Sequence, residues 1–497
     1  LLPRKRAKTT SYIAELLLVT TREDELFLNH CRYLGLKADE CMVKEANRRL
    51  NKYFRDPEVK AIRKKHRKKG HKLSKDDKAI LDAKRKEYGL SEYAFQDYLK
   101  VYGRQLSNYL DANTVQKIAT QVWRGASSVL FGKGKAVRFK DYDHFLSLEG
   151  KSNTTGIRYK DGYLIWGKNL KIPVRVPAND KWLHRAMQDR VKYCRIVARW
   201  HHTHWRYHLQ LILEGVPPAK PKRKVVDAVA GIDIGPSTVA AASQCGVLLQ
   251  ELGAEVNSIE AEIARLDRKM DRQRRASNPD NYDPSGRIKR LKKGERRVWH
   301  YSNGYYKTRA KRRALYAKRR ALLKQSHCML ANYMLEHLGN FFFVEKMSMV
   351  GLVKRSKKNK TSKKTGRPRS KRRFGKSIQN HAPSQFIEIL ARKAKANGGD
   401  LIRVDPTPLK ASQYDHTNDT CKKASLNQRT KVLSNGDEVQ RDLYSAFLLS
   451  CLEALDAICR SKCIANYSKF KRMHDALIQE LRRQKKAGAE FPRCMGI

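Results

Sequence analysis

Three acidic residues stand in settings where a carboxylate is unusual. Asp233 lies in an apolar run, residues 225–234, and Glu345 ends the apolar run Phe341–Val344, whereas Asp442 begins an apolar helical segment. A carboxylate near the end of a buried strand is unfavourable unless a cation compensates its charge, and hard divalent cations take carboxylate oxygens as ligands. Asp233 alone fits an ordinary hairpin turn at the surface. Taken together, the three acids predict a metal site.

The order of these acids along the chain sharpens the prediction. An acid on one strand, a second on a distant strand and a third on a helix is the order in which RNase H-like nucleases supply ligands to two Mg²⁺ ions. The ions in such sites lie ~3.5–4 Å apart, one activating a water and the other stabilising the leaving oxygen. We therefore expect Asp233, Glu345 and Asp442 to be the catalytic residues and the ligands of Mg²⁺ or Mn²⁺.

The residues around the three acids resemble one family. Gly-Ile-Asp-Ile-Gly at 231–235, Val-Glu-Lys-Met-Ser at 344–348 and Arg-Asp-Leu-Tyr-Ser-Ala-Phe at 441–447 are similar to the three split RuvC motifs of TnpB-like transposon-encoded nucleases and compact type V CRISPR effectors. The likeness covers about residues 225–450, and the N-terminal half follows it only in outline. It implies an RNA-guided DNA endonuclease that binds a structured guide RNA, recognises a short flanking duplex motif and cleaves double-stranded target DNA at one RuvC-type site.

Two other functions use the same features differently. One is a guide-RNA-dependent DNA-binding repressor that does not cut, and the three acids argue against it because a binding protein has no need of three buried carboxylates. The other is a transposase that performs strand transfer, which shares the metal chemistry. The sequence leaves open the flanking motif, the guide architecture, the cutting of collateral single strands, and whether the protein is a monomer or a homodimer.

The charge of the chain indicates a polyanionic partner. Its 497 residues contain 106 Lys and Arg against 49 Asp and Glu, a formal net charge of +57. A short DNA contact neutralises roughly 6–10 phosphates, so most of this charge needs another partner, and a large structured RNA would account for it. A membrane-surface or chromatin-like protein is the alternative, but the 40% hydrophobic content and long periodic segments favour folded domains.

The location of the protein follows from what the sequence lacks. No run approaches the ~18 apolar residues of a membrane span. The first residues, Leu-Leu-Pro-Arg-Lys-Arg, have no apolar signal-peptide core and no initiator Met, so the chain could be trimmed there. Ten cysteines form no disulfide framework and are expected to be reduced thiols. We expect a protein of the bacterial cytoplasm that associates with the nucleoid when bound to its target.

The N-terminal part predicts a β-barrel interrupted by helices. A strand at 11–20 precedes helical periodicity from 23 to about 130, and strand signals fill 136–214, including a hairpin turn at Asp161-Gly162. We expect a multidomain α+β protein whose barrel, 1–22 and 131–215, carries a helical recognition insert, 23–130. The resemblance implies that this barrel grips guide RNA. Alternation along the strands separates the histidines and argues against a metal site there: His201, His202, His204 and His208.

The C-terminal part predicts a nuclease domain with an inserted helical hairpin. A Pro/Lys-rich linker, 216–224, precedes an RNase H-like (RuvC) α/β domain at 225–411 and 442–497. Helices at 256–275 and about 302–338 form the hairpin, and the basic face of the second is expected to lie against a nucleic-acid duplex. The residues expected to make these contacts are Lys307, Arg312, Arg313, Arg319 and Arg320.

A second basic segment follows Glu345. Residues 354–376 contain 13 Lys and Arg and no acid, including Lys371, Arg372 and Arg373. Such a run also fits a nuclear-localisation signal, but its place beside a nuclease motif favours nucleic-acid contact.

Residues 412–441 depart from the family. Relatives carry two Cys-x-x-Cys pairs that bind zinc in this insert, whereas this chain has only His416 and Cys421. We expect no zinc, and a degenerate zinc-ribbon-like insert that still covers the cleft and loads the target. Lys423 and Arg429 are expected to contact the scissile strand, and Arg441 to bind nucleic acid. Residues 443–486 are expected to be helical.

Overall fold

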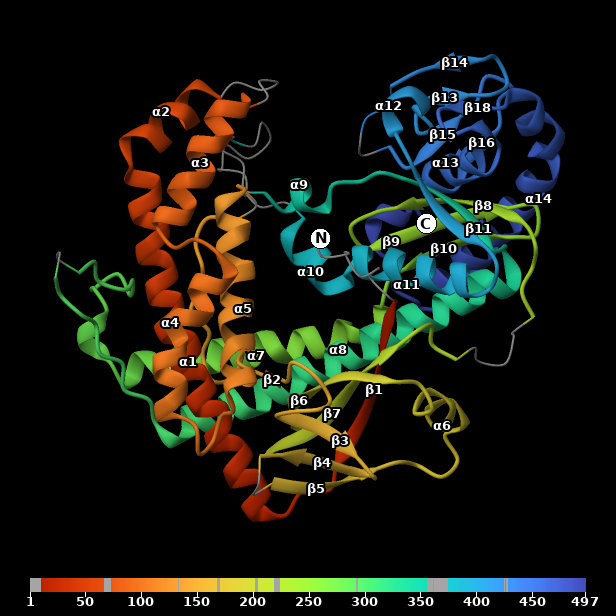
Figure 1. Cartoon of the computed structure of the whole chain (residues 1–497). Coiled ribbons are helices and arrows are strands. Elements are labelled where there is room, and N and C mark those ends of the chain that lie inside the picture. Colours follow the sequence, from red (N-terminus) through yellow and green to blue (C-terminus); the bar gives the residue numbers. More distant parts are fainter. Residues whose placement is uncertain are drawn as a thin grey trace. The chain divides into compact units, whose positions relative to one another are not determined.

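The computed structural model describes residues 10–66, 73–132, 134–167, 170–201, 204–218, 224–291, 294–354, 361, 374–423, 425 and 428–497. The chain divides into two compact units, Leu1–Lys220 and Pro221–Ile497, and the boundary falls inside the predicted linker (Figure 1). Each unit combines helices with a β-sheet, which confirms a mixed α+β multidomain chain. In the part of the chain that the structure describes, no helix is long and apolar enough to cross a membrane.

A seven-stranded antiparallel sheet organises the first unit. The N-terminal strand, β1, pairs with β7 on one side and β5 on the other, so the first strand joins the sheet as predicted. Among the described residues the strand order is linear, β2-β6-β7-β1-β5-β4-β3, and the sheet is therefore a half-barrel where we had expected a β-barrel. The edge strand β2 has only three residues, which limits how far it can extend the ladder. The strands are β1 (Ser11–Leu18), β2 (Ser147–Glu149), β3 (Ile157–Lys160), β4 (Tyr163–Trp166), β5 (Leu170–Arg175), β6 (Val191–His201) and β7 (His204–Glu214).

Two local predictions in this sheet had different outcomes. The Asp161-Gly162 hairpin is confirmed: both residues have positive φ, 50° and 82°, as a two-residue turn between twisted strands requires. The expected strand around Val137 is wrong. There the side chain of Asn47 takes the place of a strand partner, since its amide donates to the Val137 carbonyl at 2.9 Å and its carbonyl accepts from the Val137 amide at 3.2 Å.

Helices of the first unit share one hydrophobic core with the sheet. The longest, α1, begins at a capping box in which Thr21 and Asp24 satisfy each other's backbone amides. Asp111 caps α5 and also accepts from the Trp166 indole at 2.8 Å, which ties the helices to β4. The helices are α1 (Arg22–Arg55), α2 (Pro57–Lys65), α3 (Lys75–Glu87), α4 (Glu92–Gln105), α5 (Ala112–Leu130) and α6 (Lys181–Ala186).

A five-stranded sheet of order β10-β9-β8-β11-β12 organises the second unit. The central strand β8 is antiparallel to β9 and parallel to β11, which is parallel to β12. The two parallel connections run through long helical segments, whereas β8, β9 and β10 follow each other through tight turns. The strands are β8 (Val229–Ile234), β9 (Thr238–Ser243), β10 (Val247–Glu251), β11 (Phe341–Glu345) and β12 (Asp400–Val404).

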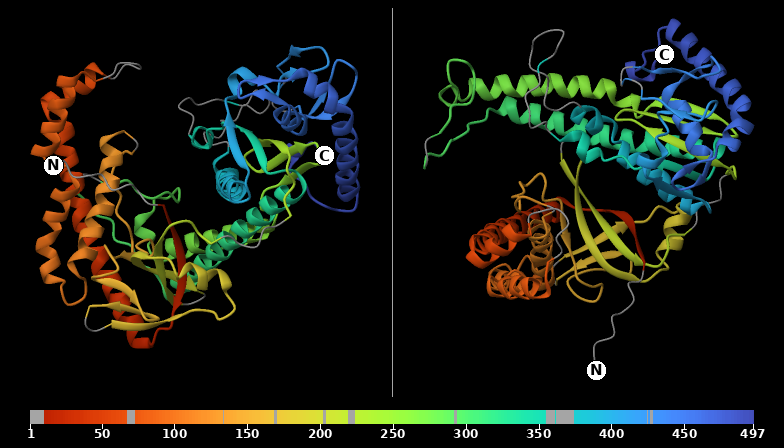
Figure 2. Two further views of the ribbon diagram at one scale, coloured as in Figure 1. Left: turned by 45° about the vertical axis from the view of Figure 1, so that its right-hand side comes forward. Right: turned by 90° about the horizontal axis from the view of Figure 1, so that it is seen from above.

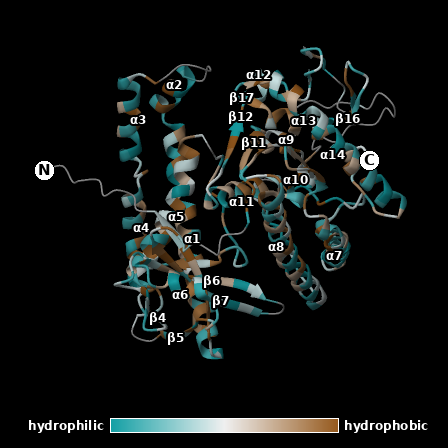
Figure 3. Ribbon diagram, turned by 90° about the vertical axis from the view of Figure 1, so that its right-hand side faces the viewer, coloured by the Kyte–Doolittle hydropathy of each residue, from teal (hydrophilic) through white to brown (hydrophobic). Residues whose placement is uncertain are grey.

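Helices cover both faces of this sheet and build two cores. Ile232, Val344 and Phe386 belong to the core on the side of α8 and α11. Ala240, Ala446 and Phe470 belong to the core on the side of α13 and α14. α7 and α8 run side by side as the predicted helical hairpin, and α7 is largely hydrophilic (Figures 2 and 3). The helices are α7 (Asn257–Ala276), α8 (Asn303–His337), α9 (Met349–Val353), α10 (Gly375–His381), α11 (Pro383–Ala396), α12 (Pro406–Leu409), α13 (Arg441–Ser450) and α14 (Arg460–Lys486).

The C-terminal helical segment is interrupted. Where continuous helix was expected from 443 to 486, α13 ends at Ser450 and a short hairpin separates it from α14. Leu452 enters the core in this hairpin, so tertiary packing overrides the helix propensity of Leu-Glu-Ala-Leu at 452–455. The remaining short strands are β13 (Tyr414–Asp415), β14 (Thr420–Cys421), β15 (Thr430–Val432), β16 (Glu438–Gln440), β17 (Leu452–Ala454) and β18 (Ala457–Ile458).

Candidate active site

Asp233 and Glu345 lie at the same edge of the sheet in the second unit. β8 and β11 are parallel with Ile232 opposite Val344, and each acid is the next residue along its strand. Because Ile232 and Val344 face the core under α8 and α11, alternation turns both acids toward the opposite face, where α13 lies. Carboxyl ends of neighbouring parallel strands thus bring together two acids that are 112 residues apart in the chain.

Gly231 lets α13 lie directly against β8. A Cβ atom on this residue would stand 2.0 Å from the carbonyl oxygen of Ala446 and 2.6 Å from the backbone nitrogen of Ser450. Both atoms belong to the backbone of α13, so rotation of a side chain could not relieve the clash. Gly231, two residues before Asp233, therefore sets the distance between β8 and the helix that carries the third acid.

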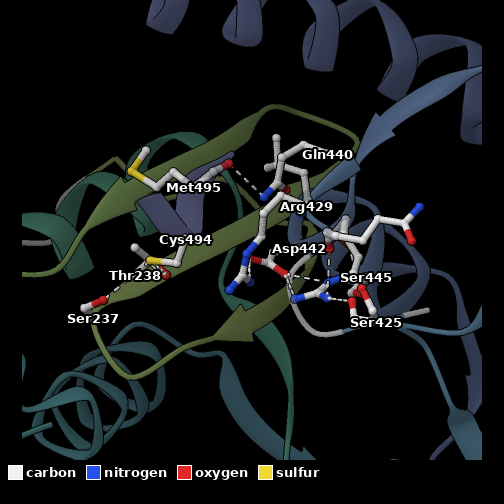
Figure 4. A network of polar contacts seen from close by, with 12 residues as sticks. Ser237, Thr238, Ser425, Arg429, Gln440, Asp442, Ser445, Cys494 and Met495 are labelled. Carbon is white, nitrogen blue, oxygen red and sulfur yellow. Dashed lines mark hydrogen bonds and ion pairs between the residues drawn. The ribbon is translucent and has the colours of Figure 1, made fainter. Parts of the chain in front are cut away.

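Asp442 lies in the first turn of α13, on that same face. Gln440 caps the helix, its side-chain oxygen accepting from the Leu443 amide at 2.7 Å. A negative charge is favourable at this end of a helix. The carboxylate also accepts from the Arg441 guanidinium at 3.2 and 3.3 Å, and a guanidinium nitrogen of Arg429 lies 4.0 Å from its other oxygen (Figure 4). Two arginines thus compensate the charge of Asp442.

Asp442 and Glu345 act electrostatically on Asp233. The pKa of Asp233 is raised well above its ordinary value, first by burial and then by the negative charges of Asp442 and Glu345, while Arg441 and Arg429 act in the opposite direction. Burial also raises the pKa of Glu345. Mutual repulsion of this kind is the electrostatic signature of carboxylates that converge on one place, and it is relieved by a cation.

The donor set fits a hard divalent cation in its chemistry. It consists of carboxylate oxygens, which Mg²⁺ and Mn²⁺ prefer, with no thiol or imidazole among the three residues. Among the residues that the structure describes, no three His, Cys, Asp or Glu side chains are grouped tightly enough to form a closed ligand set. The Asp442 carboxylate instead pairs with Arg441. The three acids thus lie on one face of the sheet, and the charges of Asp442 and Glu345 act on Asp233.

A groove opens on the α11 side of the sheet, and of the three acids only Glu345 contributes to its lining. It has a volume of about 410 Å³ and lies at the carboxyl ends of β8 and β11. Glu345, Lys346, Ser348 and Arg403 contribute its polar lining. Arg403 is paired with Glu388 at 2.5 Å, while Lys346 is exposed.

Contacts that the sequence did not predict hold the first turn of α13. The backbone amide of Gln440 donates to Nε2 of buried His474 at 2.8 Å, and the Gln440 side chain donates to the Met495 carbonyl at 3.2 Å. Burial lowers the pKa of His474, which keeps the ring neutral and Nε2 free to accept. Cys494 lies 3.7 Å from the Ser237 hydroxyl in the turn after β8 (Figure 4). The C-terminal residues thus bridge the elements that carry Asp233 and Asp442.

The insert at 412–441 is held together by a carboxylate. Asp415 accepts from the amide and hydroxyl of Thr417 at 3.0 and 2.7 Å and from those of Ser434 at 2.9 and 3.0 Å. Burial alone would raise the pKa of Asp415, but these hydrogen bonds lower it. His416 is buried and bonded to the Tyr444 hydroxyl at 2.7 Å, whereas Cys421 is exposed. His416 and Cys421 therefore lie in different surroundings. Asp415 joins the turn between β13 and β14 to the turn between β15 and β16.

We expect Asp415→Ala to loosen this insert. The substitution removes four hydrogen bonds to a buried carboxylate, a loss of about 2–4 kcal/mol that acts mainly on residues 412–441. Hydrogen exchange of these amides should quicken, while Glu438→Ala, at an exposed position of β16, should leave it unchanged. Metal analysis of the wild type should find well under one zinc per chain. Stoichiometric zinc that survives dialysis, or unchanged exchange in Asp415→Ala, would contradict this account.

Basic residues expected to contact nucleic acid lie in several environments. Arg429 and Arg441 are at the acids, and Lys423 is exposed on the insert. On α8, Lys307 and Arg320 are exposed and Arg312 is 2.5 Å from Asp267, while Arg313 is half-buried. Arg319 departs from the expected exposed face: it is buried, pairs with Glu260 and donates to the Gln379 carbonyl at 2.7 Å. Because Arg319 is buried and paired, it is not exposed for direct contact with nucleic acid. Lys371, Arg372 and Arg373 lie outside the described residues.

The raised pKa of Asp233 predicts a pH-dependent stability of the metal-free protein. Between the unfolded and the folded pKa, the folded state keeps a proton that the unfolded state has released, so stability falls as pH rises through this window. Asp233→Asn removes that titration. In chelator, the variant should match the wild type near pH 4, the usual pKa of an unfolded Asp, and melt increasingly higher toward pH 8, by roughly 2–4 °C for each 1 kcal/mol that the wild type loses. Thermal melts over this range measure it, and a constant difference across pH would contradict it.

Comparison with known proteins gives only structural matches. The chain matches a Cas12f1–sgRNA–target DNA complex at 12% identity and a TM-score of 0.42, covering 89% of this chain and 99% of that one. It also matches a CRISPR-Cas12f ternary complex (14%, TM-score 0.26, covering 87% and 83%) and a Cas12i–crRNA–dsDNA complex in the I1 state (10%, TM-score 0.23, covering 85% and 66%). No protein-family model and no curated protein sequence matches the chain.

Proposed function

We propose that this protein is an RNA-guided DNA endonuclease that cleaves its target at a single RuvC-type site. The observation that carries the proposal is the position of Asp233, Glu345 and Asp442 on one face of the sheet, where burial and then the charges of Asp442 and Glu345 raise the pKa of Asp233. A buried carboxylate whose pKa is raised further by two neighbouring acids is typical of a functional site. The motif resemblance around the same three residues supports the same function.

The parts of the chain then divide the work as the resemblance implies. The half-barrel would hold the guide RNA and help read a short flanking duplex motif, and the helices at 23–130 would form the recognition part. The RNase H-like part at 225–411 and 442–497 would cut, and the insert at 412–441 would load the target strand. An enzyme with these partners acts in the bacterial cytoplasm, at the nucleoid.

The residues at the site suit hydrolysis of a DNA phosphodiester. Asp233, Glu345 and Asp442 would hold Mg²⁺ or Mn²⁺, which when bound supplies an activated water and stabilises the leaving oxygen. Arg441 and Arg429 lie beside Asp442, where a scissile phosphate would offer them an alternative anion. Lys346 is exposed in the lining of the groove, where it would attract a phosphate backbone. The acids and the two arginines would then supply negative and positive groups around one phosphate position.

The net charge of +57 supports a permanent RNA partner. A repressor that only binds would have no use for the three acids. A transposase would share their chemistry, and the cargo separates it from a guided nuclease.

The test is the nucleic acid that the protein carries. Purified in moderate salt without nuclease, the protein should retain one defined RNA with a stem-rich scaffold, seen as a high ratio of absorbance at 260 to 280 nm and as one dominant species on sequencing. Heterogeneous fragments alone would argue against a dedicated guide. A protein that carries no RNA but joins DNA ends would establish the transposase.

A further inference from the structure

Five aromatic side chains gather where α7 and α8 are joined. The connecting segment, 277–302, lies at the end of the helical hairpin away from the five-stranded sheet (Figure 2). We call the group the hairpin-end cluster: Tyr282, Trp299, Tyr301, Tyr305 and Tyr306. None of these residues belongs to the hydrophobic cores of the unit, so packing of the fold does not account for the cluster.

Hydrogen bonds hold the segment that carries the cluster. Asn278 is buried and bonds both backbone groups of His300, donating to its carbonyl at 2.7 Å and accepting from its amide at 2.6 Å. The Asn281 side chain donates to the Val298 carbonyl at 2.7 Å, and Arg274 donates to the Tyr282 hydroxyl at 3.0 Å. These bonds fix the extended chain around Trp299, so the rings are positioned in advance of any partner.

Two of the rings belong to exposed residues. Tyr301 stacks on half-buried Tyr305 with ring centres 4.4 Å apart and an angle of 24° between the planes, and it is still 37% exposed. Tyr306 is 51% exposed and meets both of these rings edge to face. Single exposed tyrosines are ordinary on protein surfaces. Tyr301, stacked on Tyr305, and Tyr306, inclined to Tyr301 by 67°, are two adjacent exposed rings in different planes, and each could accept one base.

The surroundings of the cluster are strongly basic. Residues 287–313 contain 12 Lys and Arg and one acid, Glu295. The guanidinium groups of Arg274 and Arg297 lie 5.3 and 5.7 Å from the centre of the Trp299 ring, and that of Arg275 lies 4.9 Å from the Tyr282 ring. A ligand that suits this surface carries flat rings and negative charge together. A nucleic-acid strand carries one base and one phosphate at every nucleotide, whereas the bases of a duplex already stack on each other.

We propose that the hairpin-end cluster binds single-stranded nucleic acid, with unpaired bases stacked on Tyr301 and Tyr306. Exposed Arg296 and Lys307 flank the rings in sequence and would neutralise the phosphates of the same strand. The site differs in position and partner from the duplex contact expected along α8, and it is separate from the acids. It rests on the proposed function only for the source of the strand, which can be guide RNA or unpaired DNA.

The experiment separates stacking from the charge attraction that any basic protein shows. Affinity of the full-length protein, stripped of RNA and free of metal, is measured for labelled oligothymidylate, oligouridylate and an abasic strand of equal length and charge. The wild type should bind base-bearing strands on the order of tenfold more tightly than the abasic strand. Tyr301→Ala/Tyr306→Ala should lose most of this ratio while its affinity for the abasic strand stays unchanged.

Two further variants keep the result interpretable. Tyr301→Phe/Tyr306→Phe retains the rings and should retain the ratio, and Tyr333→Ala removes a tyrosine of similar exposure, 45%, near the other end of α8 and should also retain it. A ratio seen only with uridylate assigns the site to RNA, and one seen with both strands assigns it to single strands in general. Equal wild-type affinity for base-bearing and abasic strands, or an unchanged ratio in the double alanine variant, overturns the proposal. Neither result depends on cleavage, so the proposed nuclease is tested separately.

Discussion

Asp233→Ala should abolish guided cleavage while target binding stays near that of the wild type. The charges of Asp442 and Glu345 both act on Asp233, and the substitution removes one of three carboxylates without touching the half-barrel or the helical hairpin. A metal site supplies several kcal/mol of charge stabilisation in the transition state, and each 1.36 kcal/mol is a factor of ten in rate. We therefore expect cleavage to fall on the order of 10³-fold. Single-turnover cleavage and binding shifts on one guided substrate measure the two halves.

The same split between cutting and binding is expected for Glu345→Ala and Asp442→Ala, and cutting should need Mg²⁺ or Mn²⁺ and stop with chelator. Asp442→Ala also leaves Arg441 and Arg429 without their carboxylate, so its binding of DNA should strengthen slightly. Glu388→Ala, in the lining of the neighbouring groove, is the matched control and should cut nearly as well as the wild type. An Asp233→Ala protein that cuts at the wild-type rate would show that Asp233 is not a catalytic residue.

Gly231→Ala should destabilise the second unit severely. Its new Cβ would stand 2.0 Å from the Ala446 carbonyl oxygen, and the other close atoms, the Ser450 nitrogen and the Leu449 Cβ, also belong to α13. Relief requires α13 to move away from β8, which opens the core around Ala446 and displaces Asp442. The expected loss is about 3 kcal/mol or more in the free energy of unfolding. Denaturant unfolding should show it, together with a sharp fall in soluble yield.

Gly375→Ala is the control for this prediction. It lies in α10 of the same unit, its Cβ would meet nothing closer than 3.9 Å, and its φ is not positive, so the substitution should be neutral or slightly stabilising. If Gly231→Ala unfolds at the same denaturant concentration as Gly375→Ala, then α13 does not lie against β8 as described.

Hydrophobic periodicity was enough to predict the strands and the helix that carry the three acids. The runs at Val229–Ile234 and Phe341–Glu345 are apolar except for one acid, which is next to last in the first run and last in the second. Buried parallel strands have such apolar runs. The start of α13 at Arg441 was also predictable, because its apolar residues follow at helical spacing. Local signals of this kind need no knowledge of the rest of the fold.

The parts that the sequence did not predict depend on contacts between distant residues. Gln440 and His474 are 34 positions apart, and neither residue type marks a link between them. Asp415 could have been noticed as an acid in a turn, but its bonds to Ser434 cross from one hairpin to another. Arg319 follows the basic pattern of its helix and is nevertheless buried, because Glu260 on α7 faces it. Charge pattern alone does not distinguish a paired arginine from an exposed one.

The central claim, that Asp233, Glu345 and Asp442 together hold catalytic metal, is tested most directly by counting Mn²⁺ bound to the complex with guide and target. Electron paramagnetic resonance of the unbound ion, compared between the wild type and Asp233→Asn, cancels the Mn²⁺ that the nucleic acid holds by itself. The account predicts that the wild type binds about two more Mn²⁺ per complex than the variant at the same free concentration. Equal counts in the two proteins would contradict it.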